Sequence, residues 1–498
     1  MIKFKFKNFG PIEDGEYETK SLTVLIGPNQ SGKSFAALLT HAAMRAIAVA
    51  GIRRRRYYPY DNMPFIDSGL YSYRGRGSSR RMDNLESIST SLVSRVSDLK
   101  KNEFSALTRN ELKEIENLHP VGQFKAAFIQ QIEDAFSSDL KSLKRHNSKS
   151  GSIAGAIGDL EFSLNLSTGE VITNHDIIDL DDVFIAHVDR RRREYKAIKD
   201  GVSVELSRKD LEHYNQFPTQ LLFDILSKIS KRVPNFRSIS NSSGSIYVPA
   251  IRSGLLLSHR LFLSLLVRNA SRFGFEPVSI PQMTGVVSEF LQSLVQMPDN
   301  RYSFNKISEK RDNIVAEFEE RINGGLVVPE DAKAELGTEA LSNLVYRTQE
   351  GLELPLNLVS STVQETAPIF LMLKNRMSLR QWIVIEEPEA HLSPQNQRLM
   401  AKFLASLIHS GQKIIITTHS TFLLEQLNTE IFFSGSGKKK KRISHDDIAV
   451  VNAAQQEVGE GSKLRQISVT ESEGIDMSTF TDVYEEIYNE QMDIKAGK

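Results

Sequence analysis

The sequence contains no cysteine, no excess of charge of either sign and no long apolar run. Among its 498 residues, 62 basic side chains balance 62 acidic ones, so no global charge favours nucleic acid or acidic membranes. The lack of cysteine excludes disulfides, thiolate zinc sites and a Cys-x-x-Cys hook, and it suits a reducing cytoplasm. The most apolar segment, 255–267, is interrupted by His259 and Arg260 and is too short to span a bilayer. We therefore expect a soluble, cytoplasmic protein, too long for one ordinary domain.

The stretch 27–34 reads Gly-Pro-Asn-Gln-Ser-Gly-Lys-Ser and fits the phosphate-binding loop pattern G-x-x-x-x-G-K-[ST] at every constrained position. Its glycines let successive backbone N–H groups turn inward and form an anion-binding nest. The apolar run 22–26 predicts a buried strand before the loop, and the Ala- and Leu-rich run 35–49 predicts a helix after it. We predict that Lys33 faces the outer phosphates and Ser34 a Mg²⁺ ion. The nucleotide-binding residues predicted in this stretch are Gly27, Asn29, Gln30, Ser31, Gly32, Lys33 and Ser34.

A second apolar strand, 382–385, is followed directly by Glu386 and Glu387. A phosphate loop needs an acid at a strand end to hold its metal, and a base to activate water. We predict that Glu386 binds Mg²⁺ beside Ser34 and that Glu387 orients and deprotonates the attacking water. The alternative is a strand that simply ends in surface acids.

The next apolar strand, 414–416, runs through two threonines to His419. A lone histidine at a strand end is usually structural, either capping the strand or half-buried. Because ligands of open α/β sheets collect at the carboxyl ends of the strands, we favour a contact between His419 and the γ-phosphate.

The run 385–392, Ile-Glu-Glu-Pro-Glu-Ala-His-Leu, together with His419, resembles the ABC-type ATPase heads of the SMC, RecF and OLD group. The resemblance covers the first fifty residues, the turn 249–254 and most of 326–490. It implies an α/β P-loop NTPase fold with a mixed central sheet, an antiparallel β subdomain and helical insertions. It also implies hydrolysis of Mg²⁺-bound ATP, with residues 388–392 facing a partner subunit.

The same resemblance implies a signature loop that completes the ATP site of the partner, and the matching stretch is 359–365. It retains Ser361 for contact with the γ-phosphate, but it has Thr362 where the family usually has glycine. Since a backbone that approaches phosphate closely prefers glycine, activation of the partner is expected to be weak or conditional. The glutamine loop of the family is not identifiable, and its candidates are Gln130 and Gln131.

Changes in composition predict how the chain is organised. Alternation of apolar residues with lysines over 2–7 predicts a strand and no signal peptide. Polar residues at 144–150 predict a flexible loop, and strands that return to the core are expected near 326–328, 344–346 and 352–358. We expect residues 1–50 to form the N-terminal part of the ATPase core, 51–150 a helical insertion, 151–254 a β-rich part of the core, 255–325 a second helical insertion, 326–430 the C-terminal part of the core, and 431–498 a strand-helix cap.

Three basic clusters, 53–81 with interleaved tyrosines, 190–193 and 438–442, could contact a nucleic-acid backbone. The alternatives are a solvated surface or pairing with acids of a partner subunit. If the clusters bind DNA, added salt should weaken that binding steeply. Arg252, in the Pro-Ala-Ile-Arg-Ser-Gly turn, could face nucleotide or partner, or it could hold an acid in the core.

Without a hook, room for a long coiled-coil arm or a recognisable TOPRIM nuclease motif, the chain resembles the compact stand-alone ATPases of anti-phage systems such as Septu and PARIS. That resemblance implies an ATP-dependent switch, sensor or scaffold that controls a separate effector, a nuclease or toxin. We expect a homodimer or higher homo-oligomer that clamps ATP between its copies, and no membrane partner. The alternative function is a DNA-binding repair clamp resembling RecF.

Overall fold

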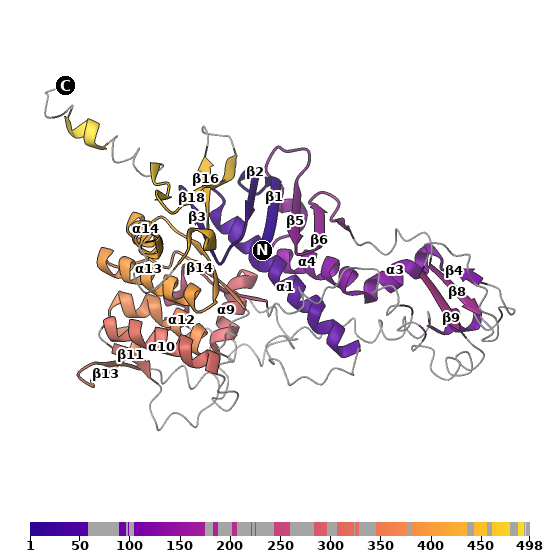
Figure 1. The fold of residues 1–498 in the computed structure, drawn as a ribbon, viewed down its shortest axis with the longest axis horizontal. Coiled ribbons are helices and arrows are strands. Elements are labelled where there is room, and N and C mark those ends of the chain that lie inside the picture. The colour runs from indigo at the N-terminus through magenta and orange to yellow at the C-terminus, as the bar shows by residue number, and fades with distance from the viewer. Residues whose placement is uncertain are drawn as a thin grey trace, which may run out of the picture.

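The computed structural model is elongated, with a large sheet and its helices at one end and a small sheet at the other (Figure 1). It describes residues 1–57, 89–95, 98, 104–174, 183–187, 202–206, 221, 225, 244–258, 283–295, 306–322, 324–327, 345–375, 381–435, 443–455, 461–478, 487–492 and 494.

An eleven-stranded mixed sheet runs through the core in the order β10-β14-β15-β3-β16-β17-β2-β1-β5-β6-β7. Strands β10 to β16 in that order are parallel, whereas β1 pairs antiparallel with both β2 and β5, and the antiparallel pairing continues through β6 to β7. The predicted α/β class, a mixed sheet with an antiparallel β part, is confirmed. The strands are β10 (Ser245–Val248), β14 (Trp382–Glu386), β15 (Lys413–Thr417), β3 (Leu22–Ile26), β16 (Ile448–Gln455), β17 (Ser462–Ile467), β2 (Ile12–Glu18), β1 (Ile2–Phe9), β5 (Ser152–Ile157), β6 (Leu160–Asn165) and β7 (Val171–Thr173).

The parallel half of the sheet is buried on both faces, which explains why its strands are almost entirely apolar. In β14, Ile383 and Ile385 belong to one hydrophobic core, whereas Trp382 and Val384 belong to the other. The same alternation divides β15, where Ile415 faces the second core alone. Successive side chains of a strand point to opposite faces, so an apolar strand needs helices on both sides.

Helices cover the two faces. On one face, α1 (Lys33–Tyr57) packs against α4 (Pro120–Phe136), and alanines of α1 let the helix lie close to the sheet. The other face is covered by helices that contribute to the first core. These helices are α9 (Gly285–Val295), α10 (Lys306–Arg321), α12 (Ser361–Asn375), α13 (Pro394–His409) and α14 (Thr421–Gly435).

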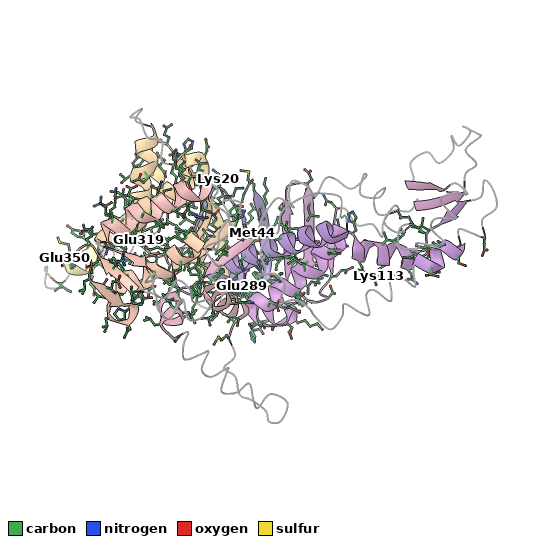
Figure 2. The ribbon with its side chains drawn as sticks, turned by 90° about the horizontal axis from the view of Figure 1, so that it is seen from below. Lys20, Met44, Lys113, Glu289, Glu319 and Glu350 are labelled. Carbon is green, nitrogen blue, oxygen red and sulfur yellow. The ribbon has the colours of Figure 1, made fainter. Side chains whose placement is uncertain are left out.

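An arm that begins beyond α4 contains α3 (Arg109–Leu118) and leads away from the core (Figure 1). Figure 2 shows Lys113 on α3 far from Glu319 on α10, with Met44 on α1 between them. At the end of the arm, β8 (Val183–His187) pairs with β4 (Phe104–Ala106) and with β9 (Val202–Leu206). The segment division stays a prediction, and this small sheet joins strands from both sides of the boundary predicted at residue 150.

Two local predictions differ from the structure. The polar stretch 144–150 is tied down, because the Arg145 amide donates to the Asn8 carbonyl and the Asn8 side chain donates to the Ser150 carbonyl. The strands predicted to return to the core instead form a separate three-stranded sheet. That sheet comprises β11 (Gly324–Val327), β12 (Val345–Thr348) and β13 (Glu353–Pro355), and a 3-10 turn follows at Leu356–Leu358.

The remaining described elements are short. They are the 3-10 turns Leu140–Leu143 and His445–Asp447, and the paired strands β18 (Val469–Thr470) and β19 (Gly474–Ile475). No helix in the described ranges is both long and apolar enough to cross a membrane. The predicted clusters 190–193 and 438–442 lie outside the described residues, as do the side chains of 53–81.

Replacement of Phe128 by alanine is expected to lower the free energy of unfolding by about 3–5 kcal/mol. Phe128 is fully buried between Phe124, 5.4 Å away centroid to centroid, and Phe162 of β6, 4.9 Å away. It therefore holds α4 to the antiparallel half of the sheet. Urea unfolding would measure the loss. The matched control is Phe432→Ala, which removes an exposed side chain of α14, and a change within about 0.5 kcal/mol is expected there. Equal effects at the two positions would contradict the assignment of Phe128 to the core.

Candidate active site

Three parallel strand ends bring the predicted site residues to one edge of the sheet. Strand β15 lies between β14 and β3, and Thr417 pairs in register with Glu386 on one side and with Leu25 on the other. The loop that starts at Gly27, the acids that follow β14 and the histidine that follows β15 therefore leave the sheet side by side. This edge is where ligands of open parallel sheets bind.

The phosphate-loop glycines are required by their surroundings. Gly27 has φ +133°, and a Cβ atom there would lie 2.4 Å from the carbonyl oxygen of Ala453. Gly32 has φ +91°, and a Cβ atom there would lie 2.6 Å from Cγ1 of Ile12. Since side chains rarely tolerate either condition, these positions accept only glycine without a shift of the backbone. Between them, Asn29 and Gln30 are exposed at the tip of the loop.

Lys33 is the first residue of α1, and its side chain is only 6% exposed. Its Nζ donates to the carbonyl oxygens of Gly27 at 2.9 Å and Pro28 at 2.6 Å, so the lysine folds back over the loop. Burial lowers the pKa of Lys33 to about 8, although the nearby carboxylates of Glu387 and Glu389 oppose this. The structure thus holds a poorly solvated ammonium group over the nest where phosphate would lie.

The lowered pKa of Lys33 predicts that ATP affinity decreases at high pH. The ammonium form binds phosphate, and in the free protein it loses its proton as pH rises through about 8. We expect the dissociation constant to be constant below that pH and to rise about tenfold per pH unit above it. A fluorescent ATP analogue titrated without metal would measure this. The control is Lys33→Arg, whose guanidinium stays charged, and an equal rise in that variant would assign the effect to another group.

The acidic end of β14 is held in a strained turn. Glu387 has φ +42°, and its amide donates to the Thr417 carbonyl at 3.0 Å, which extends the β14–β15 ladder by one residue. Glu386 accepts a hydrogen bond from the amide of Ala250 at 3.2 Å. Non-glycine residues with positive φ are uncommon and are concentrated at functional sites. The turn separates the two carboxylates, so that each can serve a different partner.

Glu387 and His419 form the exposed pair of the site. Oε1 of Glu387 lies 3.8 Å from Nε2 of His419, and their side chains are 42% and 35% exposed. Burial and the positive charge of Lys33 lower the pKa of His419, against the opposing effect of Glu387. The imidazole is therefore mostly neutral at pH 7 and has one N–H to donate. A carboxylate base and a neutral donor beside a buried lysine suit attack by water on a phosphoryl group.

Glu389 is a buried member of the site, although its position in the sequence predicted only a place in the partner-facing loop 388–392. Its Oε1 accepts hydrogen bonds from the Thr418 hydroxyl at 2.5 Å and from the His419 amide at 2.9 Å. Burial raises the pKa of its carboxyl group. Glu389 therefore fixes the backbone that carries His419. The alternation of acids around Pro388 was the signal in the sequence, but it did not distinguish the buried acid from the exposed one.

The residues at this edge fit a magnesium-bound nucleotide. Ser34, exposed in the first turn of α1, supplies a hydroxyl, and Glu386 supplies a carboxylate. Mg²⁺ is usually bound by one or two such protein ligands together with substrate phosphates. No cluster of three or more histidines or acids in the described part of the chain could hold a metal alone. The buried hydroxyl of Ser31 makes no hydrogen bond to any described group, which leaves it available to a phosphate oxygen.

The predicted signature loop lies on a separate element. Ser361 is exposed and begins α12, and the hydroxyl of Thr362 accepts a hydrogen bond from Asn396 of α13 at 3.2 Å. Pro368 lies inside α12, which begins seven residues earlier at Ser361. The missing N–H of proline removes one hydrogen bond within the helix without ending it.

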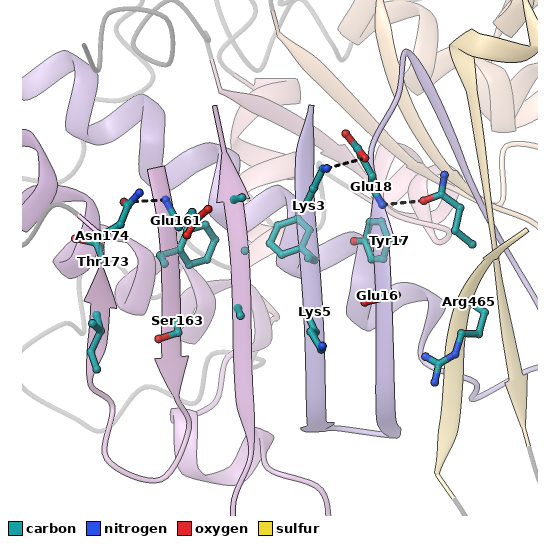
Figure 3. Close-up of a pocket in the computed structure, with 17 residues that line it drawn as sticks. Lys3, Lys5, Glu16, Tyr17, Glu18, Glu161, Ser163, Thr173, Asn174 and Arg465 are labelled. Carbon is teal, nitrogen blue, oxygen red and sulfur yellow. Dashed lines mark hydrogen bonds and ion pairs between the residues drawn. The ribbon is translucent and has the colours of Figure 1, made fainter. Parts of the chain in front are cut away.

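Two candidates, Gln131 and Arg252, have buried side chains. Gln131 accepts a hydrogen bond from Arg45 at 3.3 Å, on the face of the sheet that α1 covers. Arg252 is fully buried and pairs with Glu365, so it holds an acid in the core. A hollow of about 810 Å³ on the antiparallel half of the sheet, lined by residues such as Lys5, Glu16 and Ser163, contains none of the site residues (Figure 3).

Comparison with known proteins supports an ATPase. Residues 275–424 match the AAA ATPase domain family, and this range includes Ser361, Glu386, Glu387 and His419. This part of the chain is similar to an AAA ATPase domain, and the predicted ATPase activity is confirmed at that level. No curated protein matches the chain.

Similar solved structures are heads of SMC proteins. The SMC head domain from Thermotoga maritima has 11% identity and a TM-score of 0.34, and the match covers 94% of this chain and 98% of that one. The SMC head bound to the C-terminal winged-helix domain of ScpA has 10% identity, a TM-score of 0.37 and the same coverage. The SMC head with an extended coiled coil bound to the C-terminal domain of ScpA from Pyrococcus furiosus has 11% identity and a TM-score of 0.33, with 98% and 100% coverage.

Proposed function

We propose that this protein, in which residues 275–424 match the AAA ATPase domain family, is an ATP-dependent switch in which two or more copies clamp ATP between head-to-tail faces. One observation carries the proposal. The phosphate loop, the acidic pair and His419 lie together at one edge of the sheet, whereas Ser361 is exposed at the start of another helix. A serine with that position suits the nucleotide of a neighbouring copy.

Within one copy, each residue has a distinct role in the proposal. The nest 27–32 and Lys33 bind the phosphates, and Ser34 and Glu386 would hold Mg²⁺, which when bound neutralises charge on the phosphate oxygens. Glu387 orients the attacking water and accepts its proton, since its carboxylate is exposed and next to His419. The neutral His419 donates a hydrogen bond to the γ-phosphate. Glu389 keeps the backbone of His419 in place through its two hydrogen bonds.

Between copies, Ser361 contacts the γ-phosphate bound by the other chain. An exposed helix start suits this role, because its backbone N–H groups and its dipole favour an anion. The hydrogen bond between Asn396 and Thr362 links this helix start to α13, which follows the partner-facing loop 388–392. Hydrolysis removes the γ-phosphate and with it the contact that joins the two copies. The site thereby couples turnover to association.

We further propose that the switch acts in the cytoplasm as the sensor or scaffold of an anti-phage defence system and controls a separate nuclease or toxin. The support is the resemblance of the motifs to compact defence ATPases and the lack of cysteine, which suits a reducing cytoplasm. Capture of the tagged wild-type protein from its own host, followed by mass spectrometry, tests for the effector. Retention of duplex DNA with a steep salt dependence, and no protein effector, would instead favour the repair clamp.

Sedimentation velocity of the wild-type protein tests the switch directly. We expect a dimer or larger species with Mg²⁺ and a non-hydrolysable ATP analogue, and smaller species with ADP or without nucleotide. The specific ATPase activity should rise with protein concentration over the same range. A constant sedimentation coefficient and a concentration-independent specific activity would overturn the proposal, because each copy would then work alone.

A further inference from the structure

We propose that Arg252 and Glu365 form a positioning unit that connects the start of α12 to the backbone of Glu387. The inference rests on the proposed roles of Ser361 and Glu387. Neither Arg252 nor Glu365 is placed to touch the nucleotide, because both are buried. Instead, they fix the start of α12 relative to the backbone of Glu387. Through these two residues, contact between a neighbouring copy and the signature loop changes the position of Glu387, the proposed base.

The guanidinium of Arg252 is bound almost entirely by backbone. Its Nη1 donates to the carbonyl oxygens of Glu386 at 2.8 Å and of Pro249 at 3.5 Å, and its Nη2 donates to that of Glu387 at 3.0 Å. Its Nε donates to the carbonyl oxygen of Glu365 at 3.0 Å. A planar guanidinium presents its donors in a rigid fork, so these acceptors are fixed relative to one another.

Glu365 completes the connection from the side of α12. Its Oε2 lies 3.3 Å from Nη2 of Arg252, and its Oε1 accepts a hydrogen bond from the Ser253 hydroxyl at 2.5 Å. Ser361 and Glu365 are four positions apart in one helix, so they lie about one turn apart on the same face. A displacement or tightening of the helix start by phosphate at Ser361 therefore reaches Glu365 directly.

Because the backbone of Glu387 is strained, the position of this residue depends on the hydrogen bonds made by its carbonyl and amide groups. With φ +42°, the residue occupies a conformation that its own side chain disfavours, and the surrounding contacts must hold it there. Arg252 binds the carbonyl on one side of this residue, while Thr417 accepts from its amide on the other. Together they set the direction of the carboxylate. A shift of about 1 Å in such a group can cost about 10²-fold in rate.

The test compares Arg252→Lys and Glu365→Gln with Lys374→Met. Lysine keeps the charge of Arg252 but cannot span the two carbonyls, and glutamine keeps the shape of Glu365 but weakens the ion pair. Lys374 also lies on α12 and pairs with Glu319 of α10 at 2.7 Å, away from the strand ends. It therefore controls for general loosening of this helix. Each variant is assayed as the full chain for stability, ATP affinity, turnover and dependence of turnover on protein concentration.

We expect Arg252→Lys and Glu365→Gln to keep ATP affinity within about threefold and to lose the concentration-dependent rise in turnover. Lys374→Met should keep that rise. The inference is overturned if the wild type shows the rise and both variants retain it, or if Lys374→Met loses it equally. If one variant does not fold, the other decides. If the wild type shows no rise, the proposed switch itself fails, which is a different result.

Discussion

Replacement of Glu387 by glutamine is expected to lower ATP turnover by about 10²- to 10⁴-fold and to leave ATP affinity nearly unchanged. Glutamine keeps the size of the side chain and its ability to orient water, but it cannot accept the proton. The carboxylate is 42% exposed, so the substitution should not disturb the core. Multiple-turnover and single-turnover measurements with Mg²⁺ and ATP would both report the loss.

The same Glu387→Gln variant should accumulate in a nucleotide-bound oligomer with ATP itself. The wild type resets by hydrolysis, so its oligomer should disappear as ATP is consumed. The matched control is Glu425→Gln, an exposed acid on α14 outside the site, for which normal turnover and normal decay of the oligomer are expected. Unaltered turnover in Glu387→Gln would remove this residue from the role of base. If the oligomer accumulated while turnover stayed normal, hydrolysis by Glu387 would not be the step that releases the oligomer.

Two inactive variants, Lys33→Ala and Ser361→Arg, should restore activity when mixed. Lys33→Ala removes the charge that faces the outer phosphates in its own chain, whereas Ser361→Arg places a bulky cation at the exposed loop that serves the other chain. A mixed dimer then has one complete site, formed by the phosphate loop of one chain and the signature loop of the other. Equal amounts should regain about a quarter of wild-type turnover, because half of the dimers are mixed and each has one of two sites.

The informative control for the mixing experiment carries both substitutions on one chain and is mixed with the wild type. Such a mixed dimer has no complete site, so it should add nothing to the activity of the remaining wild-type dimers. Each variant alone should stay at least about tenfold below the wild type. Restoration by the doubly substituted chain, or none by the separate pair, would contradict the head-to-tail arrangement.

The local elements of the site could be predicted because each depends on residues that are adjacent in sequence. The apolar runs before Gly27 and Glu386 predicted buried strands, and the alanine-rich run after Ser34 predicted a helix that the structure contains. The phosphate-loop pattern requires glycine at positions 27 and 32. The structure supplies the reason, because Ala453 and Ile12 lie too close to these positions for a side chain to fit. The fold class followed from these runs and from the resemblance that they carry.

Residues that act through burial were harder to predict. Glu389 and Glu387 are separated by one proline in an acidic run, but only one of them is buried. For Arg252 the sequence left three roles open, which were contact with nucleotide, contact with a partner subunit or pairing with an acid in the core. Nothing nearby in the sequence indicates which acid it meets. Its partner Glu365 lies on a helix more than a hundred residues later in the chain.

The sequence by itself determined the phosphate loop, the two apolar strands with polar residues at their carboxyl ends and the absence of any thiol chemistry. Only the tertiary structure decided that β15 lies between β14 and β3, and so that Glu387, His419 and Lys33 share one edge. It also decided that the Arg252 fork binds the carbonyls of both acids. The physical reason is that patterning encodes burial and local conformation, whereas strand order and buried charge pairing depend on contacts between distant segments.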